Sequence, residues 1–112
     1  MATAAECERA FAALAERLAA VDPATRKRNS LDRSLSCTLT DLDLVFAAHL
    51  KDGLLEDIHR AEVADGQVKL AMTSDQLVAL VDGSDNFASA WAGRRVKLDA
   101  RMTDLLKLRS IF

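Results

Sequence analysis

The sequence has no tyrosine, and Phe and Trp together make up only 4% of its 112 residues. Proteins that bind single-stranded nucleic acid stack the bases on aromatic side chains, so this scarcity argues against that function. An excess of positive charge is missing too, because 15 Lys and Arg stand against 17 Asp and Glu, for a net charge of −2. Such a chain would release few counterions from a polyphosphate. We therefore expect no nucleic acid partner.

Long hydrophobic runs are also missing. Apolar stretches such as Leu77 to Val81 fall far short of the roughly 20 residues that a membrane-spanning helix needs. The segment from Met1 to Val21 contains several Glu and Arg residues, which the apolar region of a secretory signal peptide does not tolerate. The sequence therefore predicts a cytoplasmic protein.

Residues that commonly carry chemistry are few. The two cysteines, Cys7 and Cys37, have neither a CxxC motif nor a nearby His to complete a metal-ligand set, so we expect both to be reduced and to pack as small apolar residues. The two histidines, His49 and His59, are not accompanied by a HExxH or GxSxG motif. The sequence predicts no metal, no cofactor and no catalytic residue, and therefore no enzyme.

What is abundant is Ala and Leu, with 20 and 17 residues, which is ample for one packed core. The spacing of Thr3 and Glu6 is that of a capping box, and apolar residues then recur at helical intervals, which predicts a helix from Thr3 to Val21. The polar segment from Asp22 to Arg33 is expected to be an exposed loop. Its basic cluster Arg26-Lys27-Arg28 is open to two interpretations, as a solvated loop or as a contact for anionic lipid headgroups or a coenzyme A phosphate.

From Ser34 to Thr73 the apolar residues alternate with polar ones, which is typical of strands with one buried face. Asp52-Gly53 and Asp65-Gly66 have the chemistry of tight turns. Together these features predict four consecutive strands in an antiparallel meander.

Helical periodicity returns after Thr73, where a short helix is expected to end at Gly83. A second short helix is expected to be capped by Asp85 and to end at Gly93, with positive φ at both glycines. A fifth strand is predicted over Arg95 to Asp99, followed by a last helix over residues 102–112. The predicted fold class is α+β, with a five-stranded, mostly antiparallel sheet covered on one face by helices, in a single domain of residues 1–112.

The part of the chain from Val68 to Phe112 resembles the sterol carrier protein 2 domain, the non-specific lipid-transfer family. The likeness rests on a strand that ends in Met72-Thr73-Ser74-Asp75, a helix that ends at Gly83, the segment Ala90-Trp91-Ala92-Gly93 before a strand, and a last helix with Leu105, Leu106 and Leu108 before Phe112. The chain looks like a short stand-alone bacterial member. It departs from many relatives by having Asp99-Ala100 in place of a glycine after the final strand, and its end, Ser110-Ile111-Phe112, lacks the Ser-Lys-Leu-like signal of peroxisomal relatives.

The resemblance implies that the protein binds and transfers a sterol, a fatty acid or a fatty acyl-CoA in an apolar cavity between sheet and helices. It also implies a transient contact with membrane surfaces and is compatible with a homodimer. By family layout and spacing, the candidate lipid-binding residues are Phe46, Leu50, Met72, Leu77, Leu80, Val81, Phe87, Trp91, Leu105, Leu108 and Phe112. The alternative hypothesis is an interaction or dimerisation module that keeps this fold but has a filled cavity.

Overall fold

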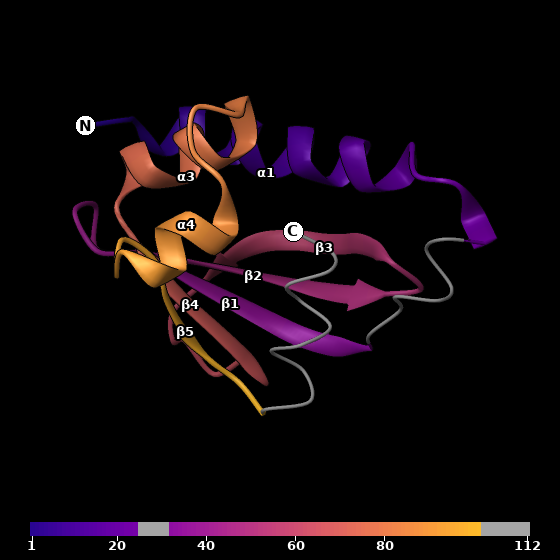
Figure 1. The fold of residues 1–112 in the computed structure, drawn as a ribbon. Coiled ribbons are helices and arrows are strands. Elements are labelled where there is room, and N and C mark those ends of the chain that lie inside the picture. Colours follow the sequence, from indigo (N-terminus) through magenta and orange to yellow (C-terminus); the bar gives the residue numbers. More distant parts are fainter. Residues whose placement is uncertain (25–31, 102–112) are drawn as a thin grey trace.

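The computed structural model describes residues 1–24 and 32–101. Within these ranges the chain forms α1 (Ala4–Ala19), β1 (Arg33–Leu39), β2 (Leu44–Lys51), β3 (Leu54–Ala61), β4 (Val68–Met72), α3 (Ser74–Asp82), α4 (Phe87–Ala92) and β5 (Lys97–Asp99). The strands form one sheet in the order β3-β2-β1-β4-β5. Figure 1 shows α1 and α3 above one face of this sheet, with α4 beside them. This arrangement confirms the predicted α+β class. The predicted last helix, and residues 25–31 of the predicted loop, lie outside the described residues.

The first helix begins where the capping box predicts. The Thr3 hydroxyl accepts a hydrogen bond from the backbone N–H of Glu6 at 3.1 Å, and the Glu6 carboxylate accepts one from the N–H of Thr3 at 3.2 Å. Two N–H groups at the helix start are satisfied in this way. The helix buries Cys7, Phe11 and Leu18 towards the sheet. It ends at Ala19, two residues before the predicted end. No described helix combines the length and the apolar character needed to cross a bilayer.

The first hairpin also follows the prediction. Asp52 and Gly53 both have positive φ, 54° and 75°, as a tight two-residue turn between twisted strands requires. β1 and β2 pair in an antiparallel register in which Leu35 lies opposite Ala48 and Cys37 opposite Phe46. Directly opposed residues share a face of the sheet, so these side chains all face the helices.

The predicted meander is wrong at its fourth strand. β4 does not pair with β3 but runs parallel to β1, with Leu35 opposite Val68. The segment before β4 is fastened to β1 by side chains: Ser34 and Gln67 exchange hydrogen bonds of 3.2 and 2.9 Å, and the Gly66 N–H donates to the Ser36 hydroxyl at 3.3 Å. A Cβ atom at position 66 would lie 2.6 Å from the Ser36 backbone nitrogen. Gly66 therefore permits a close approach of two chain segments rather than forming a hairpin turn.

Strand β3 contains an irregularity that simple alternation does not predict. Its pairing with β2 shifts so that Ala48 alone lies opposite both Asp57 and Ile58, which is a β-bulge. Asp57 has φ 54°, as the extra residue of such a bulge commonly does. The bulge resets the alternation, and as a result Leu55 and Ile58 both line the helix-covered side although they are three positions apart.

The short helices agree with the prediction in part. α3 is capped by Thr73, whose hydroxyl accepts from the Gln76 N–H at 3.2 Å, and it ends at Gly83 with φ 88°, as expected. α4 is capped by Asn86, whose side chain accepts from the Ser89 N–H at 2.8 Å. The prediction of Asp85 as this cap is wrong, because the Asp85 carboxylate is bound elsewhere.

The predicted positive φ at Gly93 is also wrong. Its φ is −82°, and the left-handed conformation falls on Arg94, with φ 61°. A Cβ atom at position 93 would lie 2.4 Å from the Arg95 guanidinium, which would have to move from its contacts with Asp85 and Ser89, and 3.3 Å from the Ser89 carbonyl oxygen. The turn that follows delays the last strand, so β5 starts at Lys97 and not at Arg95.

Candidate functional site

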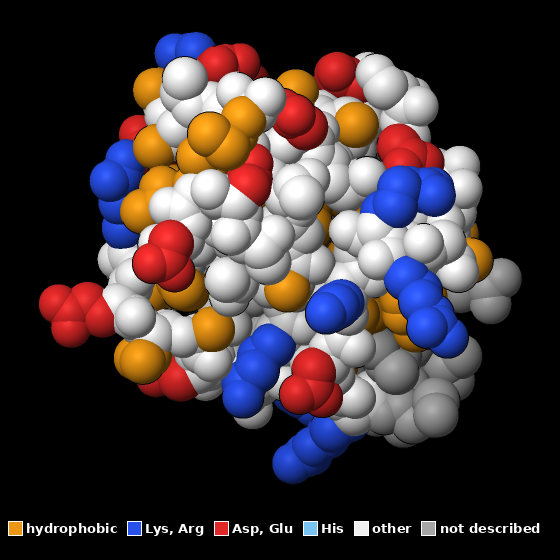
Figure 2. Space-filling view, turned by 90° about the vertical axis from the view of Figure 1, so that its left-hand side faces the viewer, with side chains coloured by type: hydrophobic (Ala, Val, Ile, Leu, Met, Phe, Trp, Pro, Cys, Tyr) orange, Lys and Arg blue, Asp and Glu red, His pale blue; other side chains and the backbone are white. Residues whose placement is uncertain are grey.

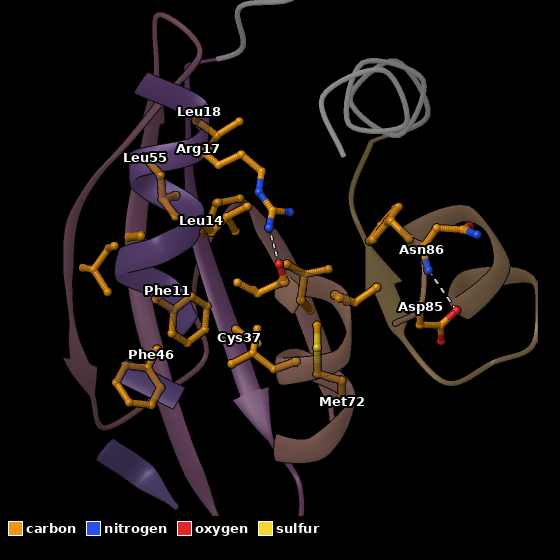
Figure 3. A pocket seen from close by; sticks show the side chains of 18 of the residues that line it. Phe11, Leu14, Arg17, Leu18, Cys37, Phe46, Leu55, Met72, Asp85 and Asn86 are labelled. Atoms are coloured by element: carbon orange, nitrogen blue, oxygen red, sulfur yellow. Dashed lines mark hydrogen bonds between the residues drawn. The ribbon is translucent and has the colours of Figure 1, made fainter. Parts of the chain in front are cut away.

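An apolar cavity of about 400 Å³ lies between the sheet and the helices. Its floor is the helix-facing side of β1 to β4, and its roof is formed by α1, α3 and the residues between α3 and α4. Figure 3 shows side chains from both layers pointing into it. The described lining residues are Phe11, Leu14, Arg17, Leu18, Val21, Leu35, Cys37, Phe46, Ala47, Ala48, Leu55, Ile58, Leu70, Met72, Leu77, Leu80, Val81, Gly83, Asp85, Asn86 and Phe87.

Most of the candidate residues that the structure describes are on this wall: Phe46, Met72, Leu77, Leu80, Val81 and Phe87. Leu50 and Trp91 are not. Leu50 is fully buried in an apolar cluster with Leu18, Leu35, Leu55 and Val68 and does not itself reach the cavity, while Trp91 packs against Phe87 with the ring centroids 6.3 Å apart. Leu105, Leu108 and Phe112 lie outside the described residues. Contact of any of these side chains with a lipid remains a prediction.

Sequence reasoning missed the contribution of the first helix. Phe11, Leu14 and Leu18 recur on one face of α1 and line the cavity together with Arg17. The signal was present, since the same apolar stripe predicts the helix. A stripe of this kind is typical of any helix that packs on a sheet, however, and does not by itself distinguish a cavity wall from a filled core.

The inner end of the cavity is aromatic and buried, with Phe11 8% and Phe46 3% exposed. The rings of Phe11 and Phe46 are 5.1 Å apart at a tilt of 43°, a favourable edge-inclined packing. Cys37 lies beside them in the wall and is 4% exposed. Burial raises the pKa of its thiol to about 12, so the sulfur remains protonated and behaves as a small apolar group.

Four of the described lining residues, Arg17, Val21, Gly83 and Asn86, are exposed to solvent and define the mouth of the cavity, where its polar groups lie. The Arg17 guanidinium donates from Nη2 to the carbonyl oxygen of Val81, and it thereby connects α1 to α3, as the dashed line in Figure 3 shows. Asp85 lies on the other side of the mouth. Its carboxylate receives two hydrogen bonds from Arg95, of 3.0 and 3.3 Å, and one of 3.0 Å from the side-chain amide of Gln76.

These contacts determine the charge at the mouth. The hydrogen bonds from Arg95, and secondly that from Gln76, hold the pKa of Asp85 below the ordinary value of a carboxyl group. The negative charge of Asp85 is therefore retained but is already paired with Arg95. Arg17 is the one cationic side chain among the described residues that line the cavity.

The histidines lie away from this cavity. His49 on β2 contacts the Asp32 carboxylate, and this hydrogen bond lowers the pKa of Asp32. His59 on β3 contacts the carbonyl oxygen of Asp57 at 2.7 Å. Across residues 1–24 and 32–101, no cluster of three His, Cys, Asp or Glu side chains is placed to hold a metal ion.

Figure 2 shows the end of the molecule at which α3 and α4 lie. Lys and Arg side chains are interspersed there with Asp and Glu, and hydrophobic side chains appear between them in small patches. This face therefore presents mixed charge and is not dominated by one sign.

A single sheet with helices over one face and an apolar cavity between the layers defines an α+β protein of two layers. Comparison with solved structures identifies the fold more closely. Sterol carrier protein 2 like 2 from Aedes aegypti superposes with a TM-score of 0.70 at 17% identity, with 96% of each chain covered. Sterol carrier protein 2 from the same organism, in complex with palmitate, superposes with a TM-score of 0.62 at 22% identity, covering 96% of this chain and 93% of that one. The protein has the sterol carrier protein 2 fold.

A larger enzyme contains the same fold. A double mutant of the sec-alkylsulfatase PisA1 matches with a TM-score of 0.66 at 22% identity, over 91% of this chain. The present chain spans only about 15% of the length of that sulfatase. No model of a protein family matches the sequence, and no curated protein matches it by sequence. The likeness is therefore one of fold, and it confirms the resemblance found from the residues after Val68.

Proposed function

We propose that this protein binds a single-chain anionic lipid, a fatty acid or fatty acyl-CoA, in the cavity between sheet and helices and transfers it without chemical change. The observation that carries the proposal is the composition of the cavity wall. It is apolar along its length and has one described cation, Arg17, at its mouth. An amphiphile with an apolar chain and an anionic head matches this distribution.

The driving force is the removal of the acyl chain from water. Each buried methylene contributes about 0.8 kcal/mol, so a chain of about 16 carbons gains roughly 13 kcal/mol before costs. Loss of ligand freedom and ordering of side chains remove much of this gain, which leaves micromolar affinity as the expectation. A wall made of such side chains distinguishes poorly between chains of similar length, so we expect broad specificity.

Arg17 favours an anionic lipid over a sterol. Its bond to the Val81 carbonyl uses one of the five N–H donors of the guanidinium, and the others suit a carboxylate or phosphate oxygen. A sterol hydroxyl would not use this charge. The palmitate complex of the Aedes aegypti sterol carrier protein 2 supports the proposal by analogy of fold.

A carrier rather than an enzyme is favoured by the state of the polar groups around the cavity. The Cys37 thiol is held protonated by burial, and the Asp85 carboxylate is engaged by Arg95. Neither group is poised as a nucleophile or as a general base. The competing hypothesis, an interaction module with a filled interior, is disfavoured by the roughly 400 Å³ of free space.

The proposal is tested by filling the cavity. Ala48 lines it from β2, and Ala71 lies on β4 between the cavity-lining residues Leu70 and Met72, so its side chain faces the opposite side of the sheet. We expect Ala48→Phe to abolish binding of palmitate in isothermal titration calorimetry, and the matched control Ala71→Phe to leave it intact. Native mass spectrometry of freshly purified protein should show copurified lipid only in the native chain and the control. Equal binding by the native protein and the Ala48→Phe variant would refute the proposed site.

A further inference from the structure

A second hollow, of about 280 Å³, lies between α1 and β3. Its walls include Glu8 and Ala12 from the helix and Ile58 and Arg60 from the strand, with Phe46 from β2 behind them. It lies at the edge of the sheet at which β3 is the last described strand. Nothing in the function proposed above uses this hollow.

Two side chains separate the second hollow from the main cavity. Phe46 and Ile58 belong to the walls of both. Phe46 is 3% exposed, and it is held on the cavity side by the Phe11 ring at 5.1 Å. A rotation of the Phe46 side chain would therefore join the two spaces into one.

An ion pair closes the outer side of the hollow. Arg60 contacts the Glu8 carboxylate with Nη2 at 2.9 Å and Nε at 3.1 Å. The same guanidinium lies 5.9 Å above the centre of the Phe46 ring, within the range of a cation–π contact. Both partners are about half exposed, and exposed pairs of this kind are weak. The ion pair and its cation–π contact thus restrain the Phe46 ring only weakly.

The position of Arg17 relative to the second hollow determines which end of a bound lipid would face the hollow. Figure 3 shows Arg17 and Leu18 at one end of the cavity-facing side of α1, and Phe11, with Phe46 of β2 beside it, at the other. Arg17 and Phe11 are six residues apart on the helix, which corresponds to roughly 9 Å along its axis. A lipid whose head lies at Arg17 therefore points its methyl end towards Phe46.

We propose that the second hollow receives the methyl end of acyl chains that are too long for the main cavity, and that Phe46, held by the Glu8–Arg60 pair, is the gate that sets the preferred chain length. This inference rests on the proposed lipid-binding function. Near its end an acyl chain meets the Phe46 ring, and the apolar part of the space behind this ring is formed by Ala12 and Ile58, while Glu8, His59 and Arg60 form its polar rim. Chains short of the gate bind without disturbing it, whereas longer chains must displace the ring and its cation–π contact.

The test is a chain-length series. Saturated fatty acids from hexanoate to eicosanoate are titrated against the native protein, Phe46→Leu and Arg60→Gln, with Arg9→Gln on the exposed side of α1 as the matched control. In the native protein we expect affinity to rise by up to about fourfold for each buried methylene and then to level off at the gate. Phe46→Leu and Arg60→Gln should move this plateau to longer chains and increase the affinity for eicosanoate relative to dodecanoate about tenfold. Arg9→Gln should follow the native curve.

The possible outcomes distinguish a failure of the gate hypothesis from a failure of the proposed lipid-binding function. Arg60 is exposed, so Arg60→Gln reports on the gate even where Phe46→Leu lowers the melting temperature. If all four proteins bind dodecanoate and show the same chain-length profile, the gate is refuted and the lipid-binding function stands. If no fatty acid binds to any of them, both the gate and the function are refuted.

Discussion

Arg17 on α1 donates a hydrogen bond to the carbonyl oxygen of Val81 in the last turn of α3, so that its guanidinium bridges the two helices at the mouth of the cavity. This position predicts a role in distinguishing lipid heads. We expect Arg17→Gln to weaken palmitate binding about fivefold, which corresponds to ~1 kcal/mol for a partly exposed charge contact. Binding of the uncharged hexadecanol should change little. Equal losses for the acid and the alcohol would indicate that Arg17 acts through packing and not through its charge.

The Asp85–Arg95 pair predicts that the free energy of unfolding falls as the pH is lowered into the acid range. Because Arg95 and Gln76 lower the pKa of Asp85 in the folded state, the unfolded chain binds the proton more readily. The contribution of this carboxylate to stability is therefore present above its unfolded pKa of about 3.9, and it is lost as the pH falls through the lower folded value. Urea unfolding should show Asp85→Asn to be less stable than the native protein at about pH 7, with the difference shrinking towards about pH 3. A difference that grows on acidification would contradict this assignment.

The contact between Gly93 and Arg95 predicts coupling between two substitutions. A methyl group at position 93 overlaps the Arg95 guanidinium, so Gly93→Ala should destabilise the native protein more than it destabilises an Arg95→Ala variant. The coupling energy from the four unfolding curves should be at least about 0.5 kcal/mol. Gly83→Ala is the control. It should cost roughly 1–2 kcal/mol in both backgrounds, because its φ of 88° is the cause and open space surrounds it. Strict additivity at position 93 would exclude the steric explanation.

The burial of the Cys37 thiol predicts that it does not react with reagents in solution while the protein is folded. Burial raises the pKa of Cys37 to about 12, and burial is also the main cause of the raised pKa of Cys7. Both thiols should react with Ellman's reagent only when the protein unfolds, so the labelling rate should follow the unfolding rate in increasing urea. Bound palmitate should slow labelling further by stabilising the folded state. Rapid labelling of Cys37 in the native protein would mean that the inner end of the cavity is open to water.

Periodicity predicted the cavity side of the sheet well, because one face of each strand must be apolar wherever helices cover it. Phe46 and Met72 are on the cavity wall for that reason. Leu50 obeys the same pattern and faces the same way, but it lies beneath the end of α1, where Leu18 fills the space. Alternation indicates the face of a sheet and carries no information on where along that face a void remains.

Features that depend on distant contacts could not be predicted. Asp52-Gly53 and Asp65-Gly66 have the same local chemistry, yet only the first forms a hairpin turn. The second is overridden by hydrogen bonds that the N–H groups of Gly66 and Gln67 donate to the hydroxyls of Ser36 and Ser34, which lie about thirty positions earlier in the chain. The position of the Arg17 side chain could not be predicted for a related reason. A charged residue beside an apolar stripe is ordinarily directed to solvent, and only the position of the Val81 carbonyl turns it towards the mouth.

The bulge at Asp57 has a further consequence for how the molecule behaves in a crowded solution. β3 is the outermost strand, and a regular outermost strand offers a row of free N–H and C=O groups to any other chain. Here the row is broken at Asp57, and the charged side chains of Glu56 and Arg60 lie on either side of the break. An incoming strand could not continue the ladder past this point. The sheet is therefore protected at this edge from joining another sheet, and from the fibrous aggregation to which such joining leads.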